Sequence, residues 1–424
     1  MKRNFIIGSL VLATIWGNGF ALATKNACLA HIEYYHVGGT LFLDNCLLNS
    51  KDALVIRNYL ARHPKIYYVS LDNNDLRDEG VKAISQISRI EYLSLRNNKI
   101  GTDGAIALGT MPSLTYLNIE YNDVDDRGAA ALAQISSLSN LSLEYNPIGS
   151  EGIAALATLK ELFSLSIGGN SRLEPGSLES LTHIQSLLIL TLVYKSLASD
   201  NIDVLANTSV VNLELINTQA ADEVASKLSA NPRLQDVAFY NTDLTDKGVA
   251  AIVMMPSLEY LRISTDEHHA NYLSDEAVIT IARQNSNLHQ VTLGGNPIGE
   301  KGAEALSQNQ SFSDLTLRNN GLTDEAACIL AKNTTLRQLE LSNQQIGNIG
   351  ATALAQNDQI KVIDLNHNQI SDEGALTFLN NTSLKFLDLT YNNIGKRGIE
   401  ALKEITAFTV IFWGNPGADP RKRS

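Results

Sequence analysis

The chain has 424 residues, 44% of them hydrophobic, and a formal net charge of −12 at pH 7. An acidic chain argues against nucleic acid as a partner, because phosphate binding needs a basic face. The charge suits a basic partner or simple solubility instead.

The first predicted element is a signal peptide over residues 1–23. Lys2 and Arg3 precede an apolar run from Phe5 to Trp16, and Ala21-Leu22-Ala23 has the small residues of a cleavage site. The run is short for a membrane span; an uncleaved amphiphilic anchor is the alternative. We expect an exported protein, periplasmic or secreted, or one delivered into a host cell. Cleavage would change the formal net charge from −12 to −14, because two cations leave, and no later segment is predicted to span a membrane.

Residues 24–65 are expected to form an N-terminal cap and a first irregular repeat. Cys28 and Cys46 both lie in this segment and, in an exported chain, are a candidate disulfide. The alternative is that Cys46 is only a buried residue at a repeat position and Cys28 is free. Cys328, much later in the chain, is predicted to be a lone thiol without a role.

A leucine and asparagine pattern recurs over residues 66–407 with a period of 24 residues. In each copy the first, fourth and sixth positions are apolar and the ninth is usually Asn, as in Leu114, Leu117, Ile119 and Asn122. Apolar and polar residues that alternate predict a strand with one buried face. An Asn amide has donors and an acceptor, so a stack of them can bridge successive turns.

Each predicted strand is followed by a helix rich in small residues, as in the stretches 128–132 and 302–306. One strand and one helix cannot bury their own apolar faces, so the copies must stack as a solenoid. The predicted helix N-caps are Asp78, Thr102, Asp126, Ser150, Asp246, Asp324 and Asp372. The predicted strand starts are Gly38, Ile66, Ile90, Leu114, Leu138, Leu162, Leu187, Val210, Leu234, Leu258, Leu288, Phe312, Leu336, Ile360, Leu384 and Phe408, with an insertion near 265–275.

These repeats resemble the ribonuclease-inhibitor-like class of leucine-rich repeats, and their helices are similar to the GALA variety of bacterial effectors. The resemblance implies an α/β solenoid: a horseshoe of about 15 repeats of 24 residues, with a parallel sheet on the concave side and helices on the convex side. It also implies a non-enzymatic protein-protein interaction module that binds a partner through its concave face. An inhibitor or activator of a partner enzyme and a structural cell-envelope protein are the alternatives.

No catalytic pattern is found: the sequence has no Gly-rich phosphate loop, no nucleophile elbow and no Cys/His set with metal spacing. We therefore expect no enzyme activity, no cofactor and no metal. Asp266, Glu267, His268 and His269 in the insertion are the one cluster that could hold a divalent ion, although adjacent residues rarely converge on one ion. Asn-x-Ser/Thr triplets, such as those at Asn333 and Asn381, are expected by chance in a repeat rich in Asn and Ser.

Positions three, five and seven of each copy should face the concavity, because side chains alternate across a sheet, and the eighth position adds Tyr121 and Tyr145. The N-terminal third of this face is rich in tyrosine and acid, which is typical of recognition surfaces. The alternative is a stack of like side chains that stiffens the sheet at the ~4.8 Å strand spacing. The predicted contact residues here are Tyr68, Tyr92, Tyr116, Glu120, Tyr121, Glu144 and Tyr145.

The middle of the face is predicted to expose apolar side chains, at Ile189, Val193, Ile216, Ala238 and Tyr240. In the same copies the ninth position is Lys195, Thr218 or Thr242 instead of Asn. An exposed apolar patch usually marks a contact surface; local rewiring or cover by the 265–275 loop is the alternative.

Towards the C-terminus the face is predicted to carry a lattice of paired charges worth little energy per pair. The acids are Glu340, Asp364 and Asp388, and the bases are Arg337, Lys361 and Lys385. Residues 408–424 should form a C-terminal cap, with Phe408, Phe412 and Trp413, and a basic tail, Arg421-Lys422-Arg423. We expect a monomer that binds a protein partner, either one from the same organism or one from a host.

Overall fold

The computed structural model describes residues 25–169, 174–197, 199–265 and 273–418. The predicted signal peptide, the cluster Asp266–His269 and the basic tail all lie outside these residues. They stay predictions.

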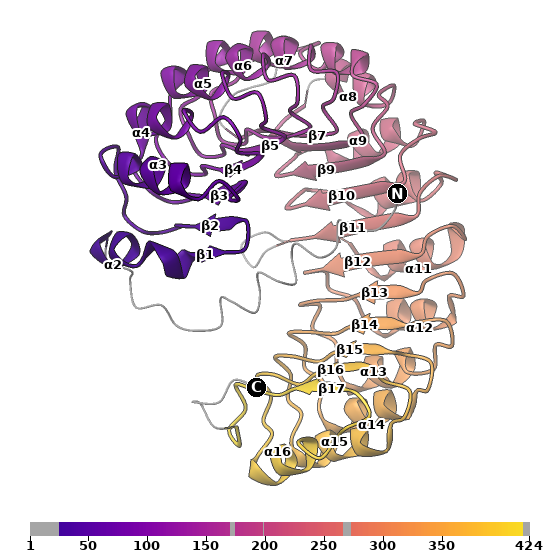
Figure 1. Cartoon of the computed structure of the whole chain (residues 1–424). Coiled ribbons are helices and arrows are strands. Elements are labelled where there is room, and N and C mark those ends of the chain that lie inside the picture. The colour runs from indigo at the N-terminus through magenta and orange to yellow at the C-terminus, as the bar shows by residue number, and fades with distance from the viewer. Residues whose placement is uncertain (1–24, 170–173, 198, 266–272, 419–424) are drawn as a thin grey trace.

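The described chain coils into a horseshoe whose inner face is one 17-stranded sheet (Figure 1). A short antiparallel pair begins it, β1 (His36–Val37) and β2 (Thr40–Phe42). From β2 onwards each strand runs parallel to the next one along the chain. The strands that follow are β3 (Tyr68–Ser70), β4 (Tyr92–Ser94), β5 (Tyr116–Asn118), β6 (Asn140–Ser142), β7 (Ser164–Gly168), β8 (Ile189–Val193), β9 (Asn212–Ile216), β10 (Asp236–Tyr240), β11 (Tyr260–Ser264), β12 (Gln290–Gly294), β13 (Asp314–Thr316), β14 (Gln338–Glu340), β15 (Val362–Asp364), β16 (Phe386–Asp388) and β17 (Thr409–Ile411).

The strand register follows the sequence repeat. Leu93, Leu117 and Leu141 are register partners on β4, β5 and β6, so the fourth position of each copy stacks in one buried column. The predicted register is confirmed from the Ile66 copy to the Leu384 copy. For the last copy the predicted start is one residue late. Thr409 pairs with Phe386, the third residue of the preceding copy, so the last copy begins one residue before Phe408.

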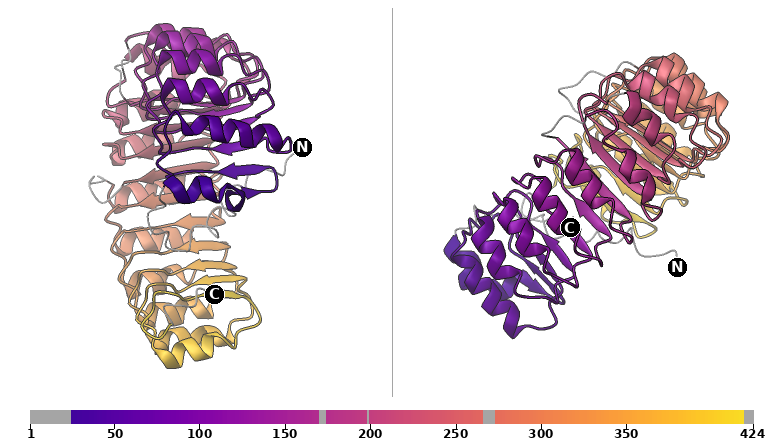
Figure 2. Two further views of the ribbon diagram at one scale, coloured as in Figure 1. Left: turned by 60° about the vertical axis from the view of Figure 1, so that its left-hand side comes forward. Right: turned by 90° about the horizontal axis from the view of Figure 1, so that it is seen from above.

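Helices cover the outer side of the sheet, so the core lies between the two layers (Figures 1 and 2). They are α2 (Lys25–Ala30), α3 (Asp52–Arg62), α4 (Arg77–Ile84), α5 (Thr102–Leu108), α6 (Asp126–Leu132), α7 (Ser150–Leu156), α8 (Ser199–Leu205), α9 (Ala221–Leu228), α10 (Asp246–Ile252), α11 (Asp275–Gln284), α12 (Glu300–Gln308), α13 (Asp324–Leu330), α14 (Asn348–Gln356), α15 (Asp372–Leu376) and α16 (Lys396–Leu402). Short 3-10 turns are η1 (Ile32–Tyr35), η2 (Glu179–His183) and η3 (Thr377–Asn380).

The predicted N-cap residues have a different role from the one expected. Six of them are the first residue of their helix, and Asp78 is the second. Asp126 accepts a hydrogen bond from the backbone N–H of Gly149, 2.6 Å away in the next repeat. Asp324 does the same for Gly347 at 2.7 Å. These carboxylates therefore cap the helix of the following repeat, because stacking brings that helix start closer than the residue's own.

The Asn residues at the ninth position form the expected ladder. The Asn122 side-chain oxygen accepts from the backbone N–H groups of Asn98 (3.0 Å) and Ile100 (2.9 Å), and its amide donates to the Leu95 carbonyl at 3.0 Å. Gln344 takes the same role in its copy and accepts from the N–H of Leu322 at 2.8 Å. Asn415 continues the ladder after β17 and accepts from Asn392 N at 3.0 Å.

The middle of the sheet departs from this scheme. Strands β7 to β12 have five residues each, whereas β3 to β6 and β13 to β17 have three. Thr218 and Thr242 replace Asn there, and their buried hydroxyl groups make no hydrogen bond within the described structure. Longer strands thus supply backbone pairing where the amide ladder lapses.

The N-terminal end is closed by the segment that contains α2 and η1. Cys28 and Cys46 form a disulfide, with Cα atoms 6.0 Å apart. Both are buried, so the bond ties α2 onto the first turn of the solenoid.

Candidate functional site

Three tyrosines form a column on the concave face, at Tyr68, Tyr92 and Tyr116. They are register partners on β3, β4 and β5. The ring centroids are 5.9 Å apart for the first pair and 6.0 Å for the second, with interplanar angles of 16° and 24°. The rings therefore stack on one another, while the Tyr92 side chain is still 38% exposed. Stacking and exposure coexist in this tyrosine column, so it is both a stiffening ladder and an accessible aromatic surface.

A second aromatic feature lies beside the tyrosine column, at the ends of β5 and β6. Tyr121 and Tyr145 stack with centroids 4.1 Å apart. Both have left-handed backbone conformations, with φ of 54° and 56°. The guanidinium of Arg96 lies 4.7 Å from the centroid of the Tyr121 ring, within cation–π range. This aromatic pair, Tyr121 and Tyr145, thus has one cation of the chain itself seated on it.

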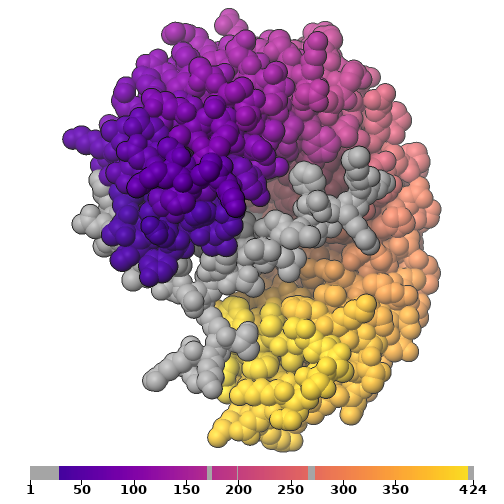
Figure 3. All heavy atoms as spheres, in the orientation of Figure 1, coloured from indigo at the N-terminus to yellow at the C-terminus, as the bar shows by residue number. Residues whose placement is uncertain are grey.

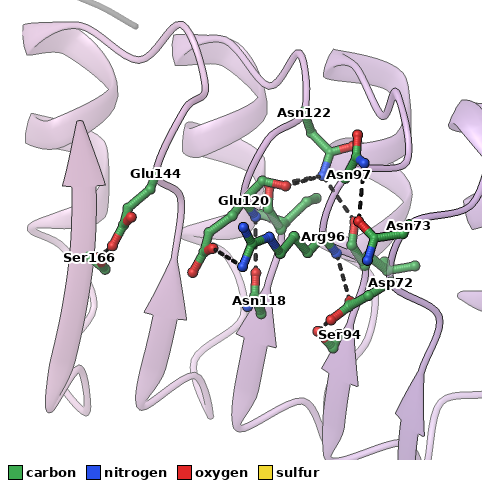
Figure 4. A network of polar contacts seen from close by, with 12 residues as sticks. Asp72, Asn73, Ser94, Arg96, Asn97, Asn118, Glu120, Asn122, Glu144 and Ser166 are labelled. Carbon is green, nitrogen blue, oxygen red and sulfur yellow. Dashed lines mark hydrogen bonds and ion pairs between the residues drawn. The ribbon is translucent and has the colours of Figure 1, made fainter. Parts of the chain in front are cut away.

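Acidic side chains line the same strand ends (Figure 4). Asp72 accepts from the Ser94 hydroxyl at 2.6 Å and from the Arg96 backbone N–H at 2.9 Å. The Arg96 guanidinium and the Glu120 carboxylate point toward one another, with a closest N–O distance of 3.6 Å. On the next strand the Ser166 hydroxyl donates to Glu144. Four adjacent strand ends therefore hold three carboxylates around a single guanidinium.

Burial sets the ionisation of this network. It raises the pKa of Glu120 to about 7, with repulsion from Glu144 adding to the rise and Arg96 opposing it. Burial also raises the pKa of Glu144 and brings the pKa of Tyr116 and Tyr121 to about 12. A cation brought close to these carboxylates would favour their ionised form.

The apolar patch predicted for the middle of the face is wrong at Val193 and Ala238; Ile189, Ile216 and Tyr240 are partly exposed, and their role as contact residues stays a prediction. Val193 is 3% exposed and Ala238 is fully buried, while Ile189 and Ile216 are only partly exposed. Val193 is buried because β8 continues as a strand to this residue, directly between Gly168 and Ile216. Ala238 lies between Glu214 and Arg262 in the register.

An ion pair that sequence reasoning missed covers Ala238. The Arg262 guanidinium lies 3.0 Å from the carboxylate of Glu214 on β9 and 2.9 Å from that of Asp236 on β10. It also donates to the Tyr240 hydroxyl at 3.1 Å. These residues occupy odd strand positions, so the rule used for the tyrosine column would have found them.

The charge lattice predicted for the C-terminal face is also wrong. Glu340 pairs with Arg318 at 2.6 Å instead of with a base at the second position. Lys361 donates to the backbone carbonyl of Asp358. Arg337, Lys361 and Lys385 each lie one residue before β14, β15 and β16, so the alternation within those strands does not direct them towards the acids. Burial raises the pKa of Asp364 and Asp388.

A third aromatic group lies at the C-terminal end of the concave face. The His367 and Tyr391 rings stack with centroids 4.3 Å apart, and Tyr391 meets Trp413 edge-on at 4.7 Å. His367 and Tyr391 have φ of 53°, the left-handed conformation already seen at Tyr121 and Tyr145.

A hollow of about 430 Å³ opens over β12, where Gly294 and Gly295 leave the strand end without side chains. Its walls include Tyr240, Arg262 and Arg318. The corresponding glycines of β7, Gly168 and Gly169, lie under tyrosine rings instead.

Models of the leucine-rich repeat match four stretches of the chain, residues 64–124, 134–157, 284–307 and 334–394. These stretches coincide with the regular copies on either side of the irregular middle. The chain has the leucine-rich repeat fold.

Solved structures share this leucine-rich repeat fold at low identity. A chain of the Rad7–Elc1 complex from yeast is 14% identical, with a TM-score of 0.51 over 86% of this chain and 88% of that one. A chain of the TLR13–ssRNA13 complex is 17% identical, with a TM-score of 0.52 over 83% of this chain and 56% of that one. An internalin from Listeria monocytogenes is 22% identical over 80% of this chain and 83% of that one, with a TM-score of 0.41. No curated protein matches the sequence. The likenesses to the Rad7–Elc1 and TLR13–ssRNA13 chains show the fold alone.

In the described part of the leucine-rich repeat chain, no three His, Cys, Asp or Glu residues are grouped so that they could hold a metal ion. No helix there has the length and apolarity needed to cross a membrane. The concave face thus presents aromatic rings, carboxylates and hydroxyls as the chemistry available to a partner.

Proposed function

We propose that the chain is a non-enzymatic protein-binding module, exported by a bacterium, whose concave face contacts a protein partner. The contact begins on the tyrosine column and the aromatic pair. Convex helices at a 24-residue period support placing it in the ribonuclease-inhibitor-like class with GALA-type helices.

One observation carries this proposal: bulky aromatic residues occupy a strained backbone position. The eighth residue of a copy is left-handed, and Asn73, Asn97, Asn319 and Asn343 show the residue that suits it. A larger side chain there costs about 1 kcal/mol or more. Tyr121, Tyr145 and Tyr391 adopt the left-handed conformation despite this cost, and their rings lie on the concave face. Rings kept at such a cost are suited to recognition, where tyrosine combines a large contact area with a hydroxyl.

The test is photo-cross-linking in the native environment. A photoreactive phenylalanine analogue replaces Tyr92 on β4, and in a second variant Ile106 on α5 of the same repeat. Both native side chains are exposed, at 38% and 43%, but they lie on opposite sides of the solenoid. The proposal expects a specific covalent adduct with one protein from position 92 and none from position 106. Adducts from position 106 alone would place the partner on the helices and refute the concave contact.

The disulfide between Cys28 and Cys46 supports the export part of the proposal, because disulfides persist in oxidising compartments. Fractionation followed by mass measurement of the N-terminus tests it. A chain that begins at Thr24 outside the inner membrane is the expected result. An intact Met1 in the cytoplasm with both cysteines reduced would rule export out.

A further inference from the structure

We infer that the partner is a basic protein surface, which places lysine or arginine side chains against two rows of carboxylates on the concave face. The inference rests on the proposed concave contact and adds the chemical class of the partner to it.

The first observation is the charge balance of the concave face. Positions three, five, seven and eight of the copies carry ten carboxylates and three guanidinium groups within the described chain. The N-terminal row is Asp44, Asp72, Glu120 and Glu144, with Arg96 as its one guanidinium; the C-terminal row is Asp314, Glu340, Asp364 and Asp388, with Arg318 as its one guanidinium. Glu214 and Asp236 in the middle share Arg262. The excess negative charge therefore lies on the two arms of the horseshoe, and the middle is close to balance.

The second observation is that the arginines are already engaged. Arg96 is next to Glu120, Arg262 next to Glu214 and Asp236, and Arg318 next to Glu340. A partner with acidic side chains would have to displace one of these pairs. A partner with basic side chains meets carboxylates that form no ion pair with an arginine or lysine of the described chain, such as Glu144, Asp364 and Asp388.

The third observation shows how such a cation is held. Two of the chain's arginines combine a carboxylate with a tyrosine ring: Arg96 with Glu120 and Tyr121, and Arg262 with Asp236 and Tyr240. A ring face and a carboxylate together favour a guanidinium more than either does alone. A guanidinium of a partner placed beside a concave tyrosine and a carboxylate would be held in the same way.

The two arms face one another across the opening of the horseshoe (Figures 1 and 3). Opposed acidic rows attract a cationic partner from either side and steer it into the concavity. Basic side chains are therefore expected at both ends of the bound surface.

The test uses a fluorescent nona-arginine peptide as probe and measures its anisotropy on the full chain. The concave variant carries Asp72→Asn, Glu144→Gln, Asp364→Asn and Asp388→Asn, which keep a hydrogen-bond acceptor at each place. The control removes four exposed carboxylates of the convex helices, Glu151→Gln, Glu223→Gln, Glu300→Gln and Glu304→Gln, so both variants lose the same net charge. Circular dichroism establishes that both are folded.

We expect the concave variant to lose about tenfold in affinity and the convex control less than about twofold. The N-terminal pair and the C-terminal pair, made separately, should each lose about threefold. Equal losses in the concave and convex variants would mean that only net charge acts, and would overturn the inference. So would a wild-type chain that does not bind the peptide at low salt, or a loss confined to one arm. The cross-link at position 92 is unaffected by any of these results, so a failure here leaves the concave contact itself standing.

Discussion

The N-terminal and C-terminal repeats close the turn between helix and strand in different ways. In the N-terminal repeats the third residue before the strand start is apolar and buried, as at Met111 and Ile135. The backbone itself closes the turn: Leu138 N donates to Ile135 O at 3.0 Å. In the C-terminal repeats that residue is Asn, and the side chain closes the turn: Leu336 N donates to the Asn333 side-chain oxygen at 2.8 Å.

The asparagines add a second column of hydrogen bonds between repeats. The Asn333 amide donates to the backbone carbonyls of Leu306 at 3.1 Å and Asn309 at 2.9 Å, both in the preceding turn. Asn285, Asn309, Asn357 and Asn381 hold the equivalent place in their copies. The comparison teaches that one register can be locked either by apolar packing or by a buried amide. The switch between them occurs in the irregular middle.

The difference is tested most strongly by replacing the turn asparagine of a C-terminal repeat with an apolar residue of the kind found in the N-terminal repeats. Asn333→Ile should lower the free energy of unfolding by about 4 kcal/mol, because it removes the acceptor of two backbone N–H groups, those of Thr335 and Leu336, and the amide bonds to the preceding turn. Urea unfolding followed by circular dichroism measures the loss. A loss below about 1 kcal/mol would show that the turn re-forms with backbone bonds alone.

The reverse exchange is expected to cost slightly less. Ile135→Asn puts an amide into a site where the backbone has already closed the turn, so about 3 kcal/mol is lost from apolar burial and an unsatisfied polar group. The same urea titration applies, with Ile135→Val as a size control. An unchanged midpoint would mean that N-terminal turns accept the amide as readily as C-terminal ones.

A third prediction concerns the carboxylates of the N-terminal arm. Because burial raises the pKa of Glu120 from 4.5 to about 7, the folded state binds a proton more tightly than the unfolded state does. This contribution is present below pH 4.5 and is lost as the pH rises through 7. Glu120→Gln cannot ionise, so relative to wild type it should gain about 2 kcal/mol of stability between pH 5 and pH 8.

Melting temperatures of both proteins across this pH range measure the effect. The matched variant is Glu151→Gln on α7, whose carboxylate is exposed and outside the network, and it should leave the pH profile unchanged. A Glu120→Gln profile parallel to wild type would contradict the buried position of this carboxylate.

The smallest effect is expected for the feature that the two regions share. Asp126→Ala and Asp324→Ala each remove the cap of the following helix and should each cost about 1 kcal/mol. Equal shifts in the urea midpoint are the expected result. If only the C-terminal variant were destabilised, the cap would depend on the asparagine column, and the regions would differ in more than their turns.

Much of the fold could be predicted because the strand pattern is local. Leu117, Ile119 and Asn122 predict a strand and an asparagine ladder within a few residues, and the 24-residue period predicts the position of the other strands. The N-caps could not be assigned in this way, because the partner of Asp126 is Gly149 in the next repeat. Asn333 and Asn381 were read as chance triplets, although their spacing of twice 24 residues was available as a signal.

The concave face was predictable where single strands decide it. Tyr68, Tyr92 and Tyr116 lie as alternation requires, and their role as contact residues stays a prediction. The middle failed because Ala238 is covered by a pair formed between its two neighbouring strands, a contact that a one-strand pattern does not contain. The C-terminal lattice failed for a simpler reason: Arg337, Lys361 and Lys385 precede their strands, so strand alternation does not direct their side chains.

The aspartate caps give the solenoid a direction. Several repeats supply a carboxylate that caps the helix of the following repeat, as from Asp126 to Gly149 and from Asp324 to Gly347. A chain that emerges N-terminus first therefore presents a cap to these helices before they form, so folding can advance from the N-terminal repeats towards the C-terminal ones. The segment closed by the Cys28–Cys46 disulfide lies at the end of the solenoid where this process starts.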